Sequence, residues 1–195
     1  MDSVNPGARL NRRQVVARLL EDRGNLAVVT GLGSSTYDVA SCGDHDNNFY
    51  LWGAMGGAAM LGYGIATAQP ARPVVVFTGD GEMVMGLGSL ATIGLRPCVN
   101  LTLVVIDNGQ FGETGQQTSH TGYGLSLVEI ASTCGFDWCR EITDMSAVES
   151  LLERIHTNEG MTFATVKVNT EELERVLPPR DGALISTRFR TSIGY

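Results

Sequence analysis

Two turns that follow apolar runs carry oxygen-bearing side chains suited to a metal ion. Asp80 stands in a Gly-Asp-Gly turn directly after the apolar run 73–78. Asn108 stands in an Asp-Asn-Gly turn directly after the run 100–106. Mg²⁺ prefers carboxylate, amide, carbonyl and phosphate oxygens, and a carboxylate beside a diphosphate is repelled unless a cation lies between them. We therefore expect a metal–diphosphate site with Asp80, Asn108 and a backbone carbonyl at Gln110 as the protein's ligands.

Glycines on both sides of Asp80 support the same interpretation. Gly79 and Gly81 let the backbone turn tightly and approach a ligand, and amide groups there can face phosphate oxygens. Each turn alone has an ordinary structural explanation, because Gly, Asp and Asn are common turn residues. Their joint occurrence, each after an apolar strand, favours the metal–diphosphate site.

The elements that must position these turns are short apolar runs alternating with helical periods. Strands are expected at 26–30, 48–52, 73–78, 100–106 and 163–168. Continuously apolar strands alternating with helices indicate an α/β fold, an open parallel sheet with helices on both faces. Ligands bind at the carboxyl ends of the strands in such sheets, which is where both turns lie.

Helix signals occupy the segments between these strands. Capping-box patterns pair Asn11 with Gln14, Ser126 with Glu129, and Ser146 with Glu149. A helix rich in glycine and alanine is expected at 55–68, and a broken helix at 82–94.

The amino-acid composition excludes two classes of protein, nucleic-acid-binding proteins and disordered chains. The 195 residues carry 14 basic and 21 acidic groups, a net charge of −7, so no basic stripe is available for a nucleic acid. Hydrophobic residues make up 43%, which excludes a disordered chain. We expect one domain over residues 1–170, followed by a polar C-terminal tail, 171–195, that contacts a partner or is mobile.

The chain start and the cysteines indicate a cytoplasmic protein. The first twenty residues contain four arginines and no apolar signal segment, and the weakly polar stretch 51–68 is a glycine-rich buried helix rather than a membrane span. The four cysteines form no C-x-x-C pair, so we expect reduced thiols rather than a zinc or iron–sulfur site.

The Gly79-Asp80-Gly81 turn followed by Asn108 resembles the cofactor motif of thiamine-diphosphate enzymes, in their diphosphate-binding (PP) domain. The resemblance implies that Asp80, Asn108 and the Gln110 carbonyl hold Mg²⁺. Asp107 stands where this family usually has asparagine, at a position that is not a metal ligand.

A second segment, 52–56, resembles the family's G-x-φ-G motif. The resemblance implies that the Gly53 carbonyl accepts a hydrogen bond from the aminopyrimidine and that Met55 supports the bent cofactor. A flexible thioether suits that contact. The alternative places Met55 in the core at a helix start.

The strand end at 30–34 lies where the family also contacts the diphosphate. Gly31 and Ser34 supply donors there, and Glu82 is expected among the cofactor-binding residues. The alternative is an abbreviated nicotinamide-binding motif, but its third glycine is absent and Thr36 stands there.

Four longer strings narrow the resemblance to phosphonopyruvate and sulfopyruvate decarboxylases. They occupy 48–56, 79–82, 88–94 and 113–117. The chain departs from that group at 34–36, where Ser-Ser-Thr replaces the frequent Ser-Arg-Glu. It departs again at 116–119, where Gln-Gln-Thr-Ser replaces Gly-Gln-Pro-Thr. The sequence therefore does not identify the anionic group at the tail of the substrate.

The resemblance implies decarboxylation of a 2-oxo acid by Mg²⁺ and thiamine diphosphate. The activating glutamate belongs to a separate pyrimidine-binding (PYR) domain, so we expect this chain to be a β subunit that works with an α subunit. Glu113, Gln117 and His120 follow the metal ligands and face the substrate or transfer protons, or else form a polar interface loop. Alternatives are an acetolactate-synthase-like carboligase and a non-catalytic regulatory subunit.

Overall fold

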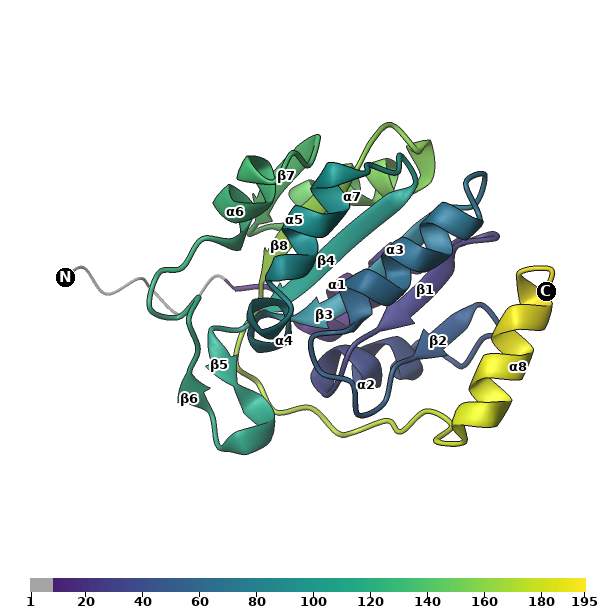
Figure 1. Cartoon of the computed structure of the whole chain (residues 1–195). Coiled ribbons are helices and arrows are strands. Elements are labelled where there is room, and N and C mark those ends of the chain that lie inside the picture. The colour runs from purple at the N-terminus through teal and green to yellow at the C-terminus, as the bar shows by residue number, and fades with distance from the viewer. Residues whose placement is uncertain (1–8) are drawn as a thin grey trace.

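Six parallel strands form one open sheet in the order β2-β1-β3-β4-β8-β7 (Figure 1). We analysed a computed structural model that describes residues 9–195, so residues 1–8 of the expected domain lie outside it. The strands are β1 Ala27–Thr30, β2 Asn48–Tyr50, β3 Val74–Gly79, β4 Leu101–Asp107, β7 Trp138–Ile142 and β8 Thr162–Lys167. A hairpin of β5 Gln110–Phe111 and β6 Gln117–Thr118 stands apart from the sheet. The expected α/β class is confirmed.

Helices cover both faces of this sheet (Figure 1). They are α1 Arg12–Leu19, α2 Ser34–Ser41, α3 Ala58–Ala68, α4 Asp80–Met85, α5 Gly88–Leu95, α6 Leu127–Thr133, α7 Met145–Thr157 and α8 Gly182–Ser192, with a 3₁₀ turn, η2, at Gly112–Thr114. Side chains of α1 and α7 enter one apolar core, and side chains of α3, α5 and α6 enter the other. Successive strand residues point to opposite faces, so Val28 joins the first core and Val29 the second. This explains why the strands are apolar throughout.

Two of the three expected helix caps are confirmed. The Asn11 side chain accepts hydrogen bonds from the Arg13 and Gln14 amides, and the Ser126 side chain accepts one from the Glu129 amide. The Ser146 prediction is wrong, because the cap of α7 is Asp144, which accepts from the Ala147 amide. An aspartate is as good an acceptor for the free amides of a first turn as a serine.

The polar C-terminal segment contains α8, which the sequence analysis did not predict. Helix α8 lies beside the edge strand β2 (Figure 1), with Ile185 in one core and Phe189 in the other. The rings of Phe49 and Phe189 meet edge to face, with centroids 5.4 Å apart. The helix therefore covers an edge that would otherwise expose unpaired backbone groups. The division of the chain at residue 170 stays a prediction.

Two further predictions concerned a membrane span and the state of the cysteines. Within residues 9–195, no helix has the length and apolar character needed to cross a membrane. All four cysteines lie in the described part of the chain, and none of them forms a disulfide.

Candidate functional site

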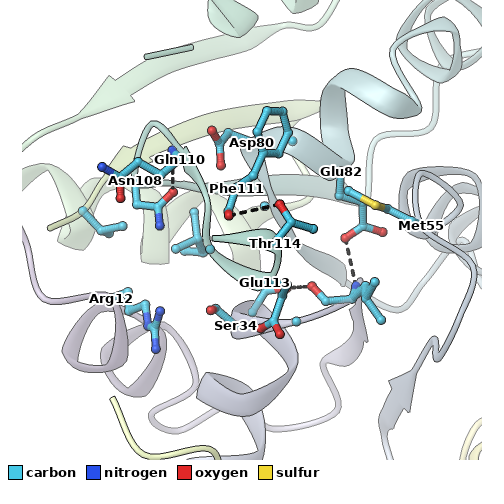
Figure 2. Close-up of a pocket in the computed structure, with 18 residues that line it drawn as sticks. Arg12, Ser34, Met55, Asp80, Glu82, Asn108, Gln110, Phe111, Glu113 and Thr114 are labelled. Atoms are coloured by element: carbon cyan, nitrogen blue, oxygen red, sulfur yellow. Dashed lines mark hydrogen bonds between the residues drawn. The ribbon is translucent and has the colours of Figure 1, made fainter. Parts of the chain in front are cut away.

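A cavity of about 170 Å³ lies at the carboxyl ends of β3 and β4 (Figure 2). It is bordered by the first turns of α2 and α4 and by the hairpin that follows β4. Most of the residues that the sequence analysis selected lie in its wall. These are Ser34, Met55, Gly79, Asp80, Gly81, Glu82, Asn108, Gln110 and Glu113. The parallel sheet thus brings together segments that are far apart in the sequence.

Asp80 is the first residue of α4 and is 4% exposed. Ser119 and Thr121 both donate hydrogen bonds to its Oδ2, the latter at 2.9 Å. No described side chain donates to Oδ1. Burial raises the pKa of Asp80, and the Ser119 hydroxyl partly opposes that shift. One carboxylate oxygen is fixed by the protein, and the other is left for a ligand.

Asn108 and Gln110 shape the turn after β4. The Asn108 Oδ1 accepts a hydrogen bond from the Gln110 amide at 2.9 Å. The Gln110 Oε1 is buried and has no hydrogen-bond partner among the described residues. Buried polar atoms normally have a partner, so this oxygen is an unused acceptor beside the cavity. Within residues 9–195, no cluster of three or more His, Cys, Asp or Glu side chains forms a metal cage. The donors present suit a hard cation whose remaining ligands come from a bound anion.

Two glycines, Gly79 and Gly81, form part of the cavity wall. A Cβ placed on Gly79 would meet no atom within 4 Å, so the backbone there borders open space. A Cβ on Gly81 would lie 2.6 Å from the Phe111 ring, so only glycine allows that ring to close this side of the cavity. The observed geometry leaves room for a ligand against the backbone at Gly79.

Glu82 is buried and joins two loops at the cavity edge. Its carboxylate accepts the Leu32 amide at 3.0 Å and the Gly56 amide at 3.3 Å. A Cβ on Gly31 would lie 1.6 Å from Glu82 Oε2, so the close approach requires glycine at 31. Burial raises the pKa of Glu82, and hydrogen bonds from the Thr78 side chain and from these two amides oppose the shift. The carboxylate therefore holds the first strand loop against the segment that carries Met55.

Four selected residues do not line the cavity. One of them, Gln117, is exposed in β6. Gly31 lies behind Glu82, and Gly53 is exposed with φ of +70°, a left-handed conformation that glycine adopts without strain. His120 is exposed and packs edge to face against Phe111, with ring centroids 6.1 Å apart. Glu113 does line the cavity, where its carboxylate lies 3.2 Å from Arg175 Nη2.

Arg12 is a cavity residue that the sequence analysis missed. It is 8% exposed, lies at the start of α1, and places its Nε 3.0 Å from Asp38 Oδ2. The sequence contains a pattern that could have identified it. Arg12 precedes three apolar residues by the helical spacings of three, four and seven positions, namely Val15, Val16 and Leu19. It therefore occupies the buried face of its helix. A buried guanidinium on such a face needs a partner or a ligand.

Comparison with protein families gives a match over most of the chain. The profile of the family described as "Thiamine pyrophosphate enzyme, C-terminal TPP binding domain" matches residues 31–166. A phosphonopyruvate decarboxylase of Streptomyces viridochromogenes is 34% identical over 95% of this chain. A sulfopyruvate decarboxylase subunit beta of Methanothermobacter thermautotrophicus is 30% identical over 93% of this chain, and one of Methanocaldococcus jannaschii is 39% identical over 65% of it.

The relatives differ in length. The chain spans 47% of the Streptomyces protein, 67% of the Methanocaldococcus protein and 92% of the Methanothermobacter protein. Among solved structures, a benzoylformate decarboxylase from Polynucleobacter necessarius aligns with a TM-score of 0.70 at 17% identity. That alignment covers 89% of this chain and 36% of the other, and it supports the fold.

Proposed function

The chain belongs to the thiamine pyrophosphate enzymes, through their C-terminal TPP binding domain, and from this membership we propose its activity. We propose that it forms the diphosphate-binding half of a decarboxylase that acts on a 2-oxo acid with an anionic tail. The tail is a phosphonate or a sulfonate, as in the substrates that give the relatives their names.

The main support for this proposal is the hydrogen bonding of the Asp80 carboxylate. Its Oδ2 is held by two hydroxyl groups, while Oδ1 receives no donor from the side chains that the structure describes. The side-chain oxygen of Gln110, which has no partner among residues 9–195, lies at the same end of the sheet. Asp80, Asn108 and the Gln110 carbonyl would hold Mg²⁺, and the diphosphate oxygens would complete its coordination. Ser34 and the amides beside Gly79 and Gly81 would bind the diphosphate.

Thiamine diphosphate, when bound, supplies the electron sink that decarboxylation of a 2-oxo acid requires. The chain's own residues bind and orient the cofactor. Met55 is 40% exposed beside Glu82 at the cavity edge (Figure 2), which suits a thioether that supports a ring from below. Gly53 is exposed, and its carbonyl would accept the aminopyrimidine's amino hydrogen.

A partner subunit would supply the activating glutamate. The carboxylates of this cavity have other roles, because Asp80 would hold the metal, Glu82 accepts two backbone amides and Glu113 pairs with Arg175. Two methionines at the Met55 end are exposed, namely Met55 at 40% and Met85, which lies beside Gly56, at 67%. This exposure supports a second polypeptide packed over the cofactor. Glu113, which lines the cavity, and His120, which packs against the cavity residue Phe111, are our candidates for contact with the substrate.

The proposed reaction is tested with the chain and a PYR-domain subunit produced together. We expect carbon dioxide and the corresponding aldehyde from phosphonopyruvate or sulfopyruvate when Mg²⁺ and thiamine diphosphate are present. Omitting the partner should abolish the activity. A hydroxyketone product would identify a carboligase, and turnover of neither acid would contradict the proposed substrate class.

A further inference from the structure

Arg12 is the one cation among the described residues that line the cavity. The other ionisable residues of the cavity wall are acidic, namely Asp80, Glu82 and Glu113. The Arg12 side chain is 9% exposed, and its Nε has no hydrogen bond of good geometry among the described residues. A charged group that is buried to this extent is expected to meet an opposite charge.

A buried aspartate holds the Arg12 guanidinium in place, but it shares its single negative charge with a second arginine. Asp38 is fully buried and lies 3.0 Å from Arg12 Nε and 3.4 Å from Arg13 Nε. Two guanidinium groups therefore share one carboxylate. Arg13 directs its Nη2 elsewhere, to the Glu174 carbonyl at 2.7 Å, and does not line the cavity. Asp38 balances one of the two positive charges, and of the two arginines only Arg12 lines the cavity.

The position of Arg12 indicates which part of a ligand it would meet. Figure 2 shows Arg12 at the end of the cavity bordered by Asn108 and Ser34, opposite the end where Met55 lies. If the cofactor's rings lie at Met55 and its diphosphate at Asp80, the terminal phosphate lies toward Arg12. A diphosphate and the Asp80 carboxylate together carry more negative charge than one divalent cation neutralises.

We propose that Arg12 binds the terminal phosphate of the cofactor and makes the site selective for a diphosphate over a monophosphate. A guanidinium suits this role because its planar donors match phosphate oxygens and it stays charged when buried. This inference rests on the proposed function, since it assigns a contact within the same cofactor site.

The test compares binding of two Mg²⁺-loaded compounds, thiamine diphosphate and thiamine monophosphate, by calorimetry on the chain produced together with a PYR-domain subunit. Arg12→Gln should weaken diphosphate binding by about ten- to a hundred-fold, because a charge-assisted hydrogen bond is lost. Its affinity for the monophosphate should change little. Arg13→Gln is the matched control, because it also removes a partner of Asp38, and it should bind both compounds like the wild type.

The binding results distinguish a failure of this inference from a failure of the proposed function. Equal diphosphate affinity in wild type and Arg12→Gln would overturn the inference, and so would an equal loss in Arg13→Gln, which would assign the effect to Asp38. No binding of thiamine diphosphate by the wild type would instead contradict the proposed function. If Arg12→Gln does not fold, Arg12→Lys keeps the charge without the planar fork. It should give a smaller loss that is again confined to the diphosphate.

Discussion

Asp107 and Lys167 are register partners at the ends of β4 and β8, and Lys167 Nζ lies 2.6 Å from Asp107 Oδ2. Lys167 is the only lysine in the sequence. Asp107 is 1% exposed, and its other oxygen lies 2.7 Å from the Thr121 hydroxyl, which also contacts Asp80. The acidic residue that replaces the usual asparagine is therefore paired and connected to the proposed metal ligand.

Removal of the lysine should be costly. Lys167→Met leaves Asp107 buried without its cation, and we expect the free energy of unfolding to fall by about 3–5 kcal/mol. Asp107→Asn should cost less, because Lys167 is partly exposed and also lies 3.5 Å from Glu141. The double variant should recover most of the loss. Urea unfolding of the four proteins measures this, and a double variant no more stable than Lys167→Met would contradict the pairing.

Glu82→Gln should loosen the cavity edge. The carboxylate accepts two backbone amides, whereas a glutamine offers one acceptor and one donor, so one amide loses its partner. We expect a loss of about 1–3 kcal/mol in stability. Hydrogen exchange of the Leu32 and Gly56 amides should accelerate for at least one of the two. Glu153→Gln, on an exposed position of α7, is the control and should leave both rates unchanged.

Gly31→Ala should be strongly destabilising because of the contact with Glu82. The new methyl group would lie 1.6 Å from a carboxylate oxygen, which forces the side chain out of its two hydrogen bonds. Gly64→Ala, in α3 with open space around it, should be neutral or stabilising by up to about 1 kcal/mol. Thermal unfolding compares the two. Adding Glu82→Ala to Gly31→Ala should restore part of the loss, and a failure to do so would locate the strain elsewhere.

The stability contributed by α8 should depend on pH through Asp44. Arg188 Nη2 donates to Asp44 Oδ1 at 2.7 Å, and this hydrogen bond lowers the pKa of Asp44. A lowered carboxyl pKa means that the stabilisation is complete above the ordinary aspartate pKa of about 3.9 and is lost as pH falls through the folded-state pKa. The pair is partly exposed, so about 1 kcal/mol or less is involved. The stability difference between wild type and Asp44→Asn should therefore shrink between pH 5 and pH 3, and a constant difference would contradict the assignment.

The sequence predicted five of the six strands, all but the edge strand β7, and the shared location of Asp80 and Asn108 at one end of the sheet, because both follow local rules. Apolar runs identify the strands, and parallel strands end at one edge. The hydroxyl groups of Ser119 and Thr121 could not be assigned to Asp80 in this way, since they lie in a loop 39 and 41 positions away. Helix α8 was missed because only a few of its residues, among them Ile185 and Phe189, are buried.

We propose above all that this chain binds thiamine diphosphate through a divalent metal at Asp80. A calorimetric titration of thiamine diphosphate into the chain produced together with a PYR-domain subunit tests this, with Mg²⁺ and with a chelator, for wild type and Asp80→Ala. We predict binding by the wild type with Mg²⁺, and at least about a tenfold weaker affinity when either the metal or the Asp80 carboxylate is removed. Affinity that is unchanged by the chelator, or retained by Asp80→Ala, would contradict the claim.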